Sequence, residues 1–171
     1  MYKSLAIIGL IISTVAYSQK TPLEKLDSMG LKLPATSVPI ANYVKFVRTG
    51  KLVFTSGHGP TKLDGQLITG TLGADISIEQ GYEAAKATGL QLLATLQAAI
   101  GDLGKVKRIV KVLGMVHCTD DFKDQPKVMN GFSDLMVAVF GDKGRHARSA
   151  VGMNALPNGM AIEIEMVVEV E

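Results

Sequence analysis

A continuous helical pattern over residues 76–100 is the feature that most constrains the fold of this chain. Ser77 and Gln80 form a capping box at its start, and Gly101 ends it. Apolar and small residues recur between these ends at the spacing of one helix face, namely Ala85, Gly89, Leu92, Leu93, Leu96, Ala99 and Ile100. A long helix with one apolar face needs a second layer to cover it, and the small residues predict close packing on a sheet.

Strand patterns surround this helix. Strands are predicted over 44–47, 52–56, 108–118, 149–156 and 160–170, and the third, rich in Val and Ile, is predicted to be a buried central strand. Asp121 and Pro126 open a second helix, which ends at Gly141. The order β-β-α-β-α-β-β predicts an α+β domain with one mixed sheet.

The first 18 residues have the pattern of a secretory signal peptide. Lys3 gives a positive start, and residues 5–16 are apolar. Within Ala16-Tyr17-Ser18, Ala16 and Ser18 are small residues at the −3 and −1 positions of a cleavage site before Gln19. The apolar run is too short for a comfortable membrane span, and the alternative is an uncleaved anchor or a buried helix. We therefore expect an exported protein, periplasmic or secreted, that has no membrane contact after cleavage.

The mature chain is expected to hold one domain. An N-terminal extension over 19–40 includes a short helix over 23–29, and the domain itself covers 41–171. Cys118 is the only cysteine, so the exported chain would have to be stable without an internal disulfide.

The composition argues against several classes of partner. The net charge is only +2, there is no Trp, and no Lys/Arg run occurs, so neither nucleic acid nor membrane is an expected partner. His58, His117, His146 and Cys118 lack the spacing of metal ligands, and the Gly-rich stretches lack a phosphate-binding pattern. Neither a metal nor a cofactor is expected.

Residues 145–165 are the strongest candidate for a functional site. They contain two strand patterns joined by Leu-Pro-Asn-Gly at 156–159, and Asn-Gly predicts a tight hairpin. Arg148 opens one strand and Glu163 lies in the other, so the hairpin could hold a small carboxylic acid and activate a water beside it. A surface hairpin with solvated charges is the alternative.

The same stretch resembles the signature of the RidA/YjgF family of reactive-intermediate deaminases. The matching residues are Ala147-Arg148-Ser149, Val151, Leu156-Pro157 and Ile162-Glu163-Ile164. Further matches are Tyr43 with the segment 48–57 (RTGKLVFTSG), and Asp121-Phe122 before the second helix. His146 departs from the family's usual Pro or Ala, and Asn154 from its small or basic residue.

This resemblance implies a chorismate-mutase-like fold, in which one sheet carries both helices on one face. It also implies a homotrimer, in which the uncovered sheet faces pack around a central barrel with a ligand cleft at each subunit interface. Two helices cover only one face of a sheet, so the other face needs a cover of this kind.

The resemblance also assigns roles to individual residues. Arg148 would bind the substrate carboxylate and Glu163 would position the attacking water, whereas Tyr43, Ser56 and Gly57 would line the pocket. His58 and His146 are further candidates for the cleft, and His117 is expected to be structural. Arg145 is expected to be a solvated loop charge. Ala150 stands where the family often has a cysteine, so any thiol chemistry is absent there.

Three functions are compatible with these residues. The first is a hydrolase that converts small carboxylate-bearing imines or enamines to 2-keto acids and ammonia without a cofactor. The second is a non-catalytic trimer that binds a small carboxylate through the same Arg148. The third is a ribonuclease activity of the kind long attached to some family members, which the nearly neutral charge disfavours.

Overall fold

The computed structural model describes residues 19–36, 42–62 and 64–171, and the predicted signal peptide lies outside them. The main elements in these ranges are α1 (Pro22–Ser28), β1 (Phe46–Thr49), β2 (Leu52–Thr55), α2 (Ile78–Ile100), β3 (Val106–His117), α3 (Gln125–Phe140), β4 (Ala147–Met153) and β5 (Ile162–Val170). Short 3-10 turns precede β3, β4 and β5.

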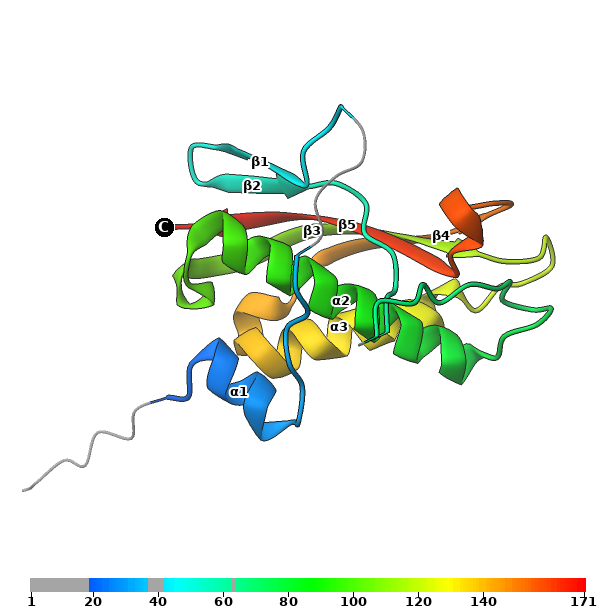
Figure 1. Ribbon diagram of the computed structural model, residues 1–171, viewed down its shortest axis with the longest axis horizontal. Coiled ribbons are helices and arrows are strands. Elements are labelled where there is room, and N and C mark those ends of the chain that lie inside the picture. Colours follow the sequence, from blue (N-terminus) through cyan, green and yellow to red (C-terminus); the bar gives the residue numbers. More distant parts are fainter. Residues whose placement is uncertain (1–18, 37–41, 63) are drawn as a thin grey trace, which may run out of the picture.

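The strands form one mixed sheet in the order β1-β2-β5-β3-β4. The pair β3–β4 is parallel and the other pairs are antiparallel. Helices α2 and α3 lie side by side on one face of the sheet (Figure 1). The predicted α+β fold with a mixed sheet and both long helices on one face is therefore confirmed.

The predicted hairpin between β4 and β5 is wrong. Asn158 and Gly159 do adopt the positive φ values that Asn-Gly turns favour, 55° and 67°. However, β3 lies between the two strands and pairs with both of them. The connection β3–α3–β4 brings β4 back parallel to β3, as a helical crossover requires. Strand β5 then pairs with the other edge of β3, so the turn spans the end of β3.

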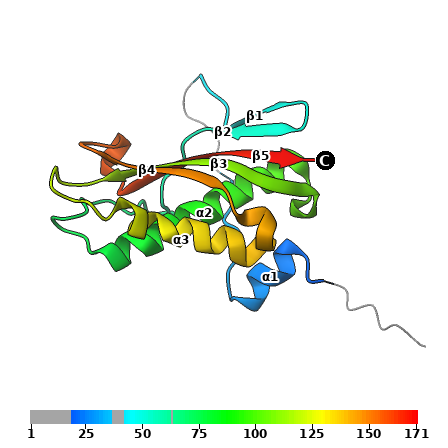
Figure 2. The same cartoon turned by 180° about the vertical axis from the view of Figure 1, so that it is seen from behind.

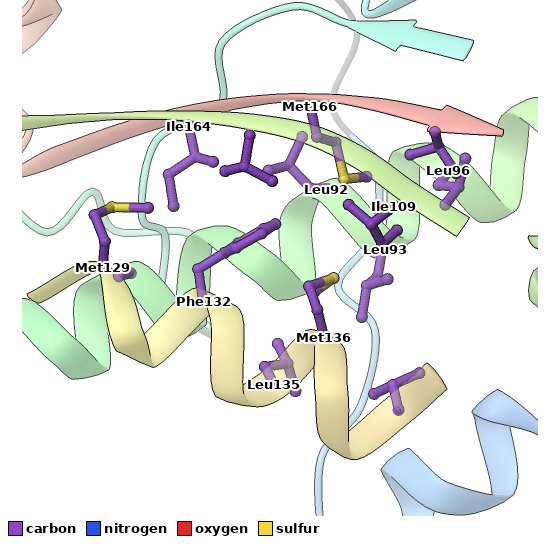
Figure 3. Packing of buried hydrophobic residues seen from close by; sticks show 14 of the residues in the cluster. Leu92, Leu93, Leu96, Ile109, Met129, Phe132, Leu135, Met136, Ile164 and Met166 are labelled. Carbon is purple, nitrogen blue, oxygen red and sulfur yellow. The ribbon is translucent and has the colours of Figure 1, made fainter. Parts of the chain in front are cut away.

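The core fills the space between the sheet and the helices. Figure 3 shows Leu92, Leu93 and Leu96 from α2 facing Ile109 and Met166 of the sheet, with Phe132 of α3 beside them. All of these side chains are at most 2% exposed. Burying a large apolar side chain stabilises a fold by roughly 1.5–3 kcal/mol, so this layer is the main source of stability.

The predicted capping box of α2 is present, since Ser77 and Gln80 each bond the other's backbone N–H. Some small residues of the long helices lie where α2 and α3 pack against each other. A Cβ at Gly89 would come within 2.9 Å of Leu135 on α3, and one at Gly131 would be 2.0 Å from the carbonyl oxygen of Tyr82. The small residues therefore allow close approach between helices as well as toward the sheet.

The N-terminal helix packs on the rest of the fold. Helix α1 lies near the end of α3 (Figure 2), and its predicted position over 23–29 is close to the observed Pro22–Ser28. Leu26 is 1% exposed, and Lys25 Nζ donates to the carbonyl oxygen of Val139 at 3.0 Å. A cation at this point interacts favourably with the carboxyl end of α3. In the described ranges, no helix is long and apolar enough to cross a membrane.

The sheet face opposite the helices is uncovered in a single chain. Along β5, alternate residues starting at Ile162 are buried against the helices, and those starting at Glu163 lie on the opposite face. Two large apolar side chains are exposed on β1 and β2, namely Val47 at 55% and Phe54 at 41%. Strand β3 is an interior strand as predicted, but only one of its faces is buried.

Candidate active site

Glu163 lies on the uncovered sheet face, directly over Gly57. An added Cβ at Gly57 would be 1.9 Å from Glu163 Oε1, so the carboxylate occupies the space that a side chain would need. Partial burial, and secondarily the negative charge of Glu165, raise the pKa of the Glu163 carboxyl above its ordinary value. A carboxyl with a raised pKa is suited to exchange protons with a bound water.

Ser56 precedes Gly57 in the chain, directly after β2 ends. Its Oγ donates to the carbonyl oxygen of Val44 at 2.6 Å, and its backbone N–H donates to the carbonyl oxygen of Lys45 at 2.9 Å. These bonds hold the segment that follows Tyr43 beside Ser56. The Tyr43 side chain is 54% exposed, so it is accessible to a ligand or a second subunit. Ser56, Gly57 and Glu163 thus form one cluster, with Tyr43 at its margin.

Arg148 belongs to a different cluster. Its Nη1 donates to Asn130 Oδ1 at 3.1 Å and to Ser133 Oγ at 2.9 Å, and its Nη2 donates to the carbonyl oxygen of Pro126 at 3.3 Å. All three acceptors are neutral, and no carboxylate in the described ranges lies within ion-pair distance of Arg148. Partial burial lowers the pKa of Arg148, and the charge of Asp134 opposes this effect.

The two clusters lie on opposite faces of the sheet within one chain. Arg148 is directly opposite Val112 of β3, whose side chain is buried against the helices, and Glu163 is opposite Met115. Residues three apart on a strand face opposite sides, and opposed residues share a side. The expectation that a single hairpin presents Arg148 and Glu163 to one ligand is therefore wrong for an isolated chain.

The histidines have distinct environments. His58 is 7% exposed, and its Nε2 lies 2.8 Å from Thr95 Oγ1 on α2, so it is a core residue and not the cleft residue expected. Burial is the main cause that lowers the pKa of His58 below its ordinary value. His117 Nε2 lies 3.5 Å from Thr71 Oγ1, and its Nδ1 is a buried atom with no hydrogen-bond partner in the described structure.

His146 joins the Arg148 cluster instead. Its Nε2 lies 3.1 Å from Ser133 Oγ, and its Nδ1 lies 2.6 Å from the carbonyl oxygen of Gly144. Arg145, by contrast, is exposed and pairs with Asp142 at 3.2 Å, as a solvated loop charge would.

The α3 residues that hold Arg148 were not predicted from the sequence. Pro126, Asn130 and Ser133 follow the i, i+4, i+7 spacing of one helix face, but this stripe contains polar side chains and lies beside the apolar residues that α3 buries. Only the pairing of β4 with β3 brings Arg148 over that stripe. The spacing was visible in the sequence, but its partner was not.

The uncovered face also contains a hollow of about 340 Å³. It is lined by Phe54, Thr55, Lys111, Leu113, Ser149, Glu165, Met166 and Val167. Lys111 Nζ donates to Ser149 Oγ at 2.9 Å across it. In the part of the chain that the structure describes, no group of three or more His, Cys, Asp or Glu side chains is arranged to hold a metal ion.

Comparison with known proteins places this geometry in a family. The family model described as "YjgF/chorismate_mutase-like, putative endoribonuclease" matches residues 24–169. The chain belongs to this YjgF family. Protein TCP17 of Trypanosoma cruzi is 45% identical over 145 residues, which cover 84% of this chain and 91% of that protein.

Solved structures of YjgF-like proteins have the same fold. A "putative endoribonuclease" from Shewanella oneidensis is 32% identical, with 88% of this chain and 100% of that one covered and a TM-score of 0.85. RidA from the Antarctic bacterium Psychrobacter is 25% identical over 81% of this chain and 96% of that one, with a TM-score of 0.55. The predicted chorismate-mutase-like fold is therefore confirmed.

Within this YjgF domain, the two departures near Arg148 have clear positions. Ala150 packs against the apolar core beside β3 and offers no thiol. His146 packs its ring edge-on to Phe132, with ring centroids 5.6 Å apart and planes inclined at 71°. The first departure removes a reactive group, and the second adds a hydrogen-bonding one.

Proposed function

We propose that this protein hydrolyses small carboxylate-bearing imines or enamines to 2-keto acids and ammonia. Arg148 binds the substrate carboxylate, and Glu163 holds the water that attacks the imine carbon. In the first step the water oxygen bonds to the imine carbon, Glu163 accepts one proton from the water, and the C=N π electrons move to nitrogen, which then takes up that proton. In the second step the carbinol hydroxyl gives its proton to the nitrogen, the C=O bond forms, and the C–N bond breaks with release of ammonia. The amino acid-derived imine is electrophilic by itself, so the reaction needs no cofactor.

The observation that carries this proposal is the state of the Arg148 guanidinium. It is half-buried and bonded only to neutral acceptors, so its positive charge is not compensated by a carboxylate within ion-pair distance among the described residues. A partly desolvated cation of this kind favours an anionic ligand strongly. A guanidinium also offers two parallel donors that match a carboxylate.

A homotrimer would complete the site. Arg148 and Glu163 lie on opposite faces of one chain, so a ligand that contacts both requires residues from two subunits. The exposed Val47 and Phe54 on the uncovered face are suited to a subunit interface. We propose that Glu163, Gly57, Ser56 and Tyr43 of one subunit face Arg148 of the next.

Glu163 has the environment that the proposed base requires. Its pKa is raised by burial and by Glu165, which brings proton exchange closer to neutral pH. A carboxylate in contact with Gly57 has little room to move on that side, and this contact defines where a bound water can lie.

The test measures ammonia and 2-keto acid release from imines that an amino-acid oxidase generates in the assay. Wild-type protein should accelerate release. Arg148→Lys should lose at least about 30-fold in kcat/KM, because a point charge does not reproduce the bidentate pair. Arg145→Ala is the matched control and should retain activity. Equal losses in Arg145→Ala and Arg148→Lys, with assembly unchanged, would refute the carboxylate-binding role.

Two other outcomes distinguish the alternatives. Saturable binding of 2-oxobutyrate that Arg148→Lys abolishes, without any imine hydrolysis, would indicate a non-catalytic carboxylate-binding trimer. The relatives described as endoribonucleases motivate a parallel assay with a single-stranded RNA. RNA cleavage that depends on Glu163, in the absence of imine hydrolysis, would favour that activity instead.

A further inference from the structure

We propose that Ser133 and His146 are positioning residues that fix the Arg148 guanidinium so that one of its edges stays open for a carboxylate. The hydrogen bonds from His146 through Ser133 to Arg148, called the support below, are present in the single chain and do not depend on any reaction. The role of the support in turnover rests on the function proposed above.

The hydrogen bonds of Arg148 account for three of its five N–H donors. Both donors of Nη1 are used, by Asn130 Oδ1 and Ser133 Oγ, and one donor of Nη2 is used by the carbonyl oxygen of Pro126. The Nε–H and one N–H of Nη2 have no hydrogen-bond partner among the described residues, and Nε and Nη2 share one side of the planar group. This side matches the two oxygens of a carboxylate.

The direction of each hydrogen bond in the support follows from chemistry. The carbonyl oxygen of Gly144 can only accept, so His146 Nδ1 carries the proton at 2.6 Å from it. In the neutral ring, Nε2 then has a lone pair, and the Ser133 hydroxyl donates to it at 3.1 Å. The Ser133 oxygen is thereby left with its lone pairs facing Arg148 Nη1 at 2.9 Å. His146 thus orients Ser133, and Ser133 orients Arg148.

The neutral state of His146 is favoured by its surroundings. Burial lowers its pKa most, and the nearby charge of Arg148 lowers it further, although the bond to Gly144 acts in the opposite direction. The edge-on contact with Phe132 fixes the ring plane. The Ser133 hydroxyl is therefore held from two sides, by helix α3, which carries it, and by His146 from the turn before β4.

Nitrogen-15 NMR of the arginine side chains tests the support without any assumption about the reaction. In wild-type protein, the Nη protons of Arg148 should rotate slowly and give separate signals, whereas those of the exposed Arg145 should be averaged. Ser133→Ala should merge the Arg148 signals, and Ser133→Thr, which retains the hydroxyl, should keep them separate. Ser149→Ala is the matched control, because Ser149 neighbours Arg148 but bonds Lys111 on the other face. Averaged Arg148 signals in wild-type protein would overturn the inference.

Kinetics tests the consequence for recognition. Ser133→Ala should raise KM for a carboxylate-bearing imine about tenfold with a smaller effect on kcat, and Ser133→Thr should restore it. An imine of similar size without a carboxylate should be unaffected. Equal losses on both imines would show that Ser133 acts only on overall structure and would refute the positioning role. If no imine is hydrolysed, the proposed function fails, but the NMR result still decides whether the support exists.

Discussion

Replacing Gly57 by alanine tests the placement of Glu163 most directly. The residue does not adopt the left-handed backbone conformation, so alanine is compatible with its backbone. The new Cβ would be 1.9 Å from Glu163 Oε1, and real Cβ atoms essentially never approach another heavy atom within 3.0 Å. The carboxylate must therefore retreat by about 1 Å or more toward the open side of the sheet.

The expected effects on stability and on activity differ in size. The displaced atom is the end of a flexible side chain on an uncovered face, so a strained rotamer costs only about 0.5–1.5 kcal/mol. The restriction of the unfolded chain by alanine offsets about 0.4–1 kcal/mol of this cost. A misplacement of about 1 Å at a reacting group can reduce the rate by about 100-fold. We expect a nearly unchanged unfolding free energy and a kcat about 100-fold lower.

A double-mutant cycle with Glu163→Ala decides whether the loss acts through the carboxylate. Imine hydrolysis gives kcat, and urea unfolding gives stability. Gly57→Ala should cost nothing further once Glu163 is removed. Gly59→Ala is the matched control, because its Cβ would approach only side-chain atoms away from Glu163, namely the flexible Met160 Sδ at 2.8 Å and Leu67 Cδ1 at 3.4 Å among the nearest atoms. A full additional loss in the Glu163→Ala background would refute the reasoning.

Four further predictions concern pH, assembly and export. The pKa of Glu163 is raised in the folded state, so the unfolding free energy should decrease as pH rises from the ordinary carboxyl pKa through the raised one. Urea titrations across this pH range should show the decrease in wild-type protein and not in Glu163→Gln. The acid limb of kcat/KM should move to lower pH in Glu165→Gln, which removes a like charge; an unmoved limb would contradict the assignment of Glu163 as the base. Light scattering should give about three times the chain mass, and a stable monomer at micromolar concentration would eliminate the shared site. Intact-mass measurement of protein exported by its host should give a chain that begins near Gln19 without a lipid, and retention of residues 1–18 would contradict cleavage.

Local signals in the sequence predict the elements well. The capping box of Ser77 and Gln80 depends only on residues three positions apart, and it appears in the structure as expected. The alternation of apolar and acidic residues along β5 depends on neighbours two positions apart, and in the structure Ile164 lies in the core and Glu163 on the opposite face. Such signals are local, so no knowledge of the rest of the fold is needed.

Signals for pairing are less reliable. Asn158-Gly159 forms a turn with the expected backbone conformation, yet the strands on either side do not pair. The turn residues determine the conformation of a few bonds. Which strand lies beside β5 depends on burying the apolar face of the whole sheet. Strand β3 has 12 residues, of which Ile109, Val112 and Val116 are fully buried, whereas β4 has seven residues and none is buried.

For the candidate site too, local sequence signals predict some features and the tertiary structure determines the others. The residue types that can bind a carboxylate and activate a water, Arg148 and Glu163, were identified from the sequence and its family resemblance. The tertiary structure alone decided that they lie on opposite faces, that Ser133 and His146 hold Arg148, and that Gly57 contacts Glu163. The physical reason is the distance along the sequence over which each property is determined. Side-chain chemistry and the alternation of a strand depend on residues next to one another. Which face of the sheet a site residue lies on relative to another, and which residues it contacts, depend on the pairing of strands and helices that are far apart in the sequence.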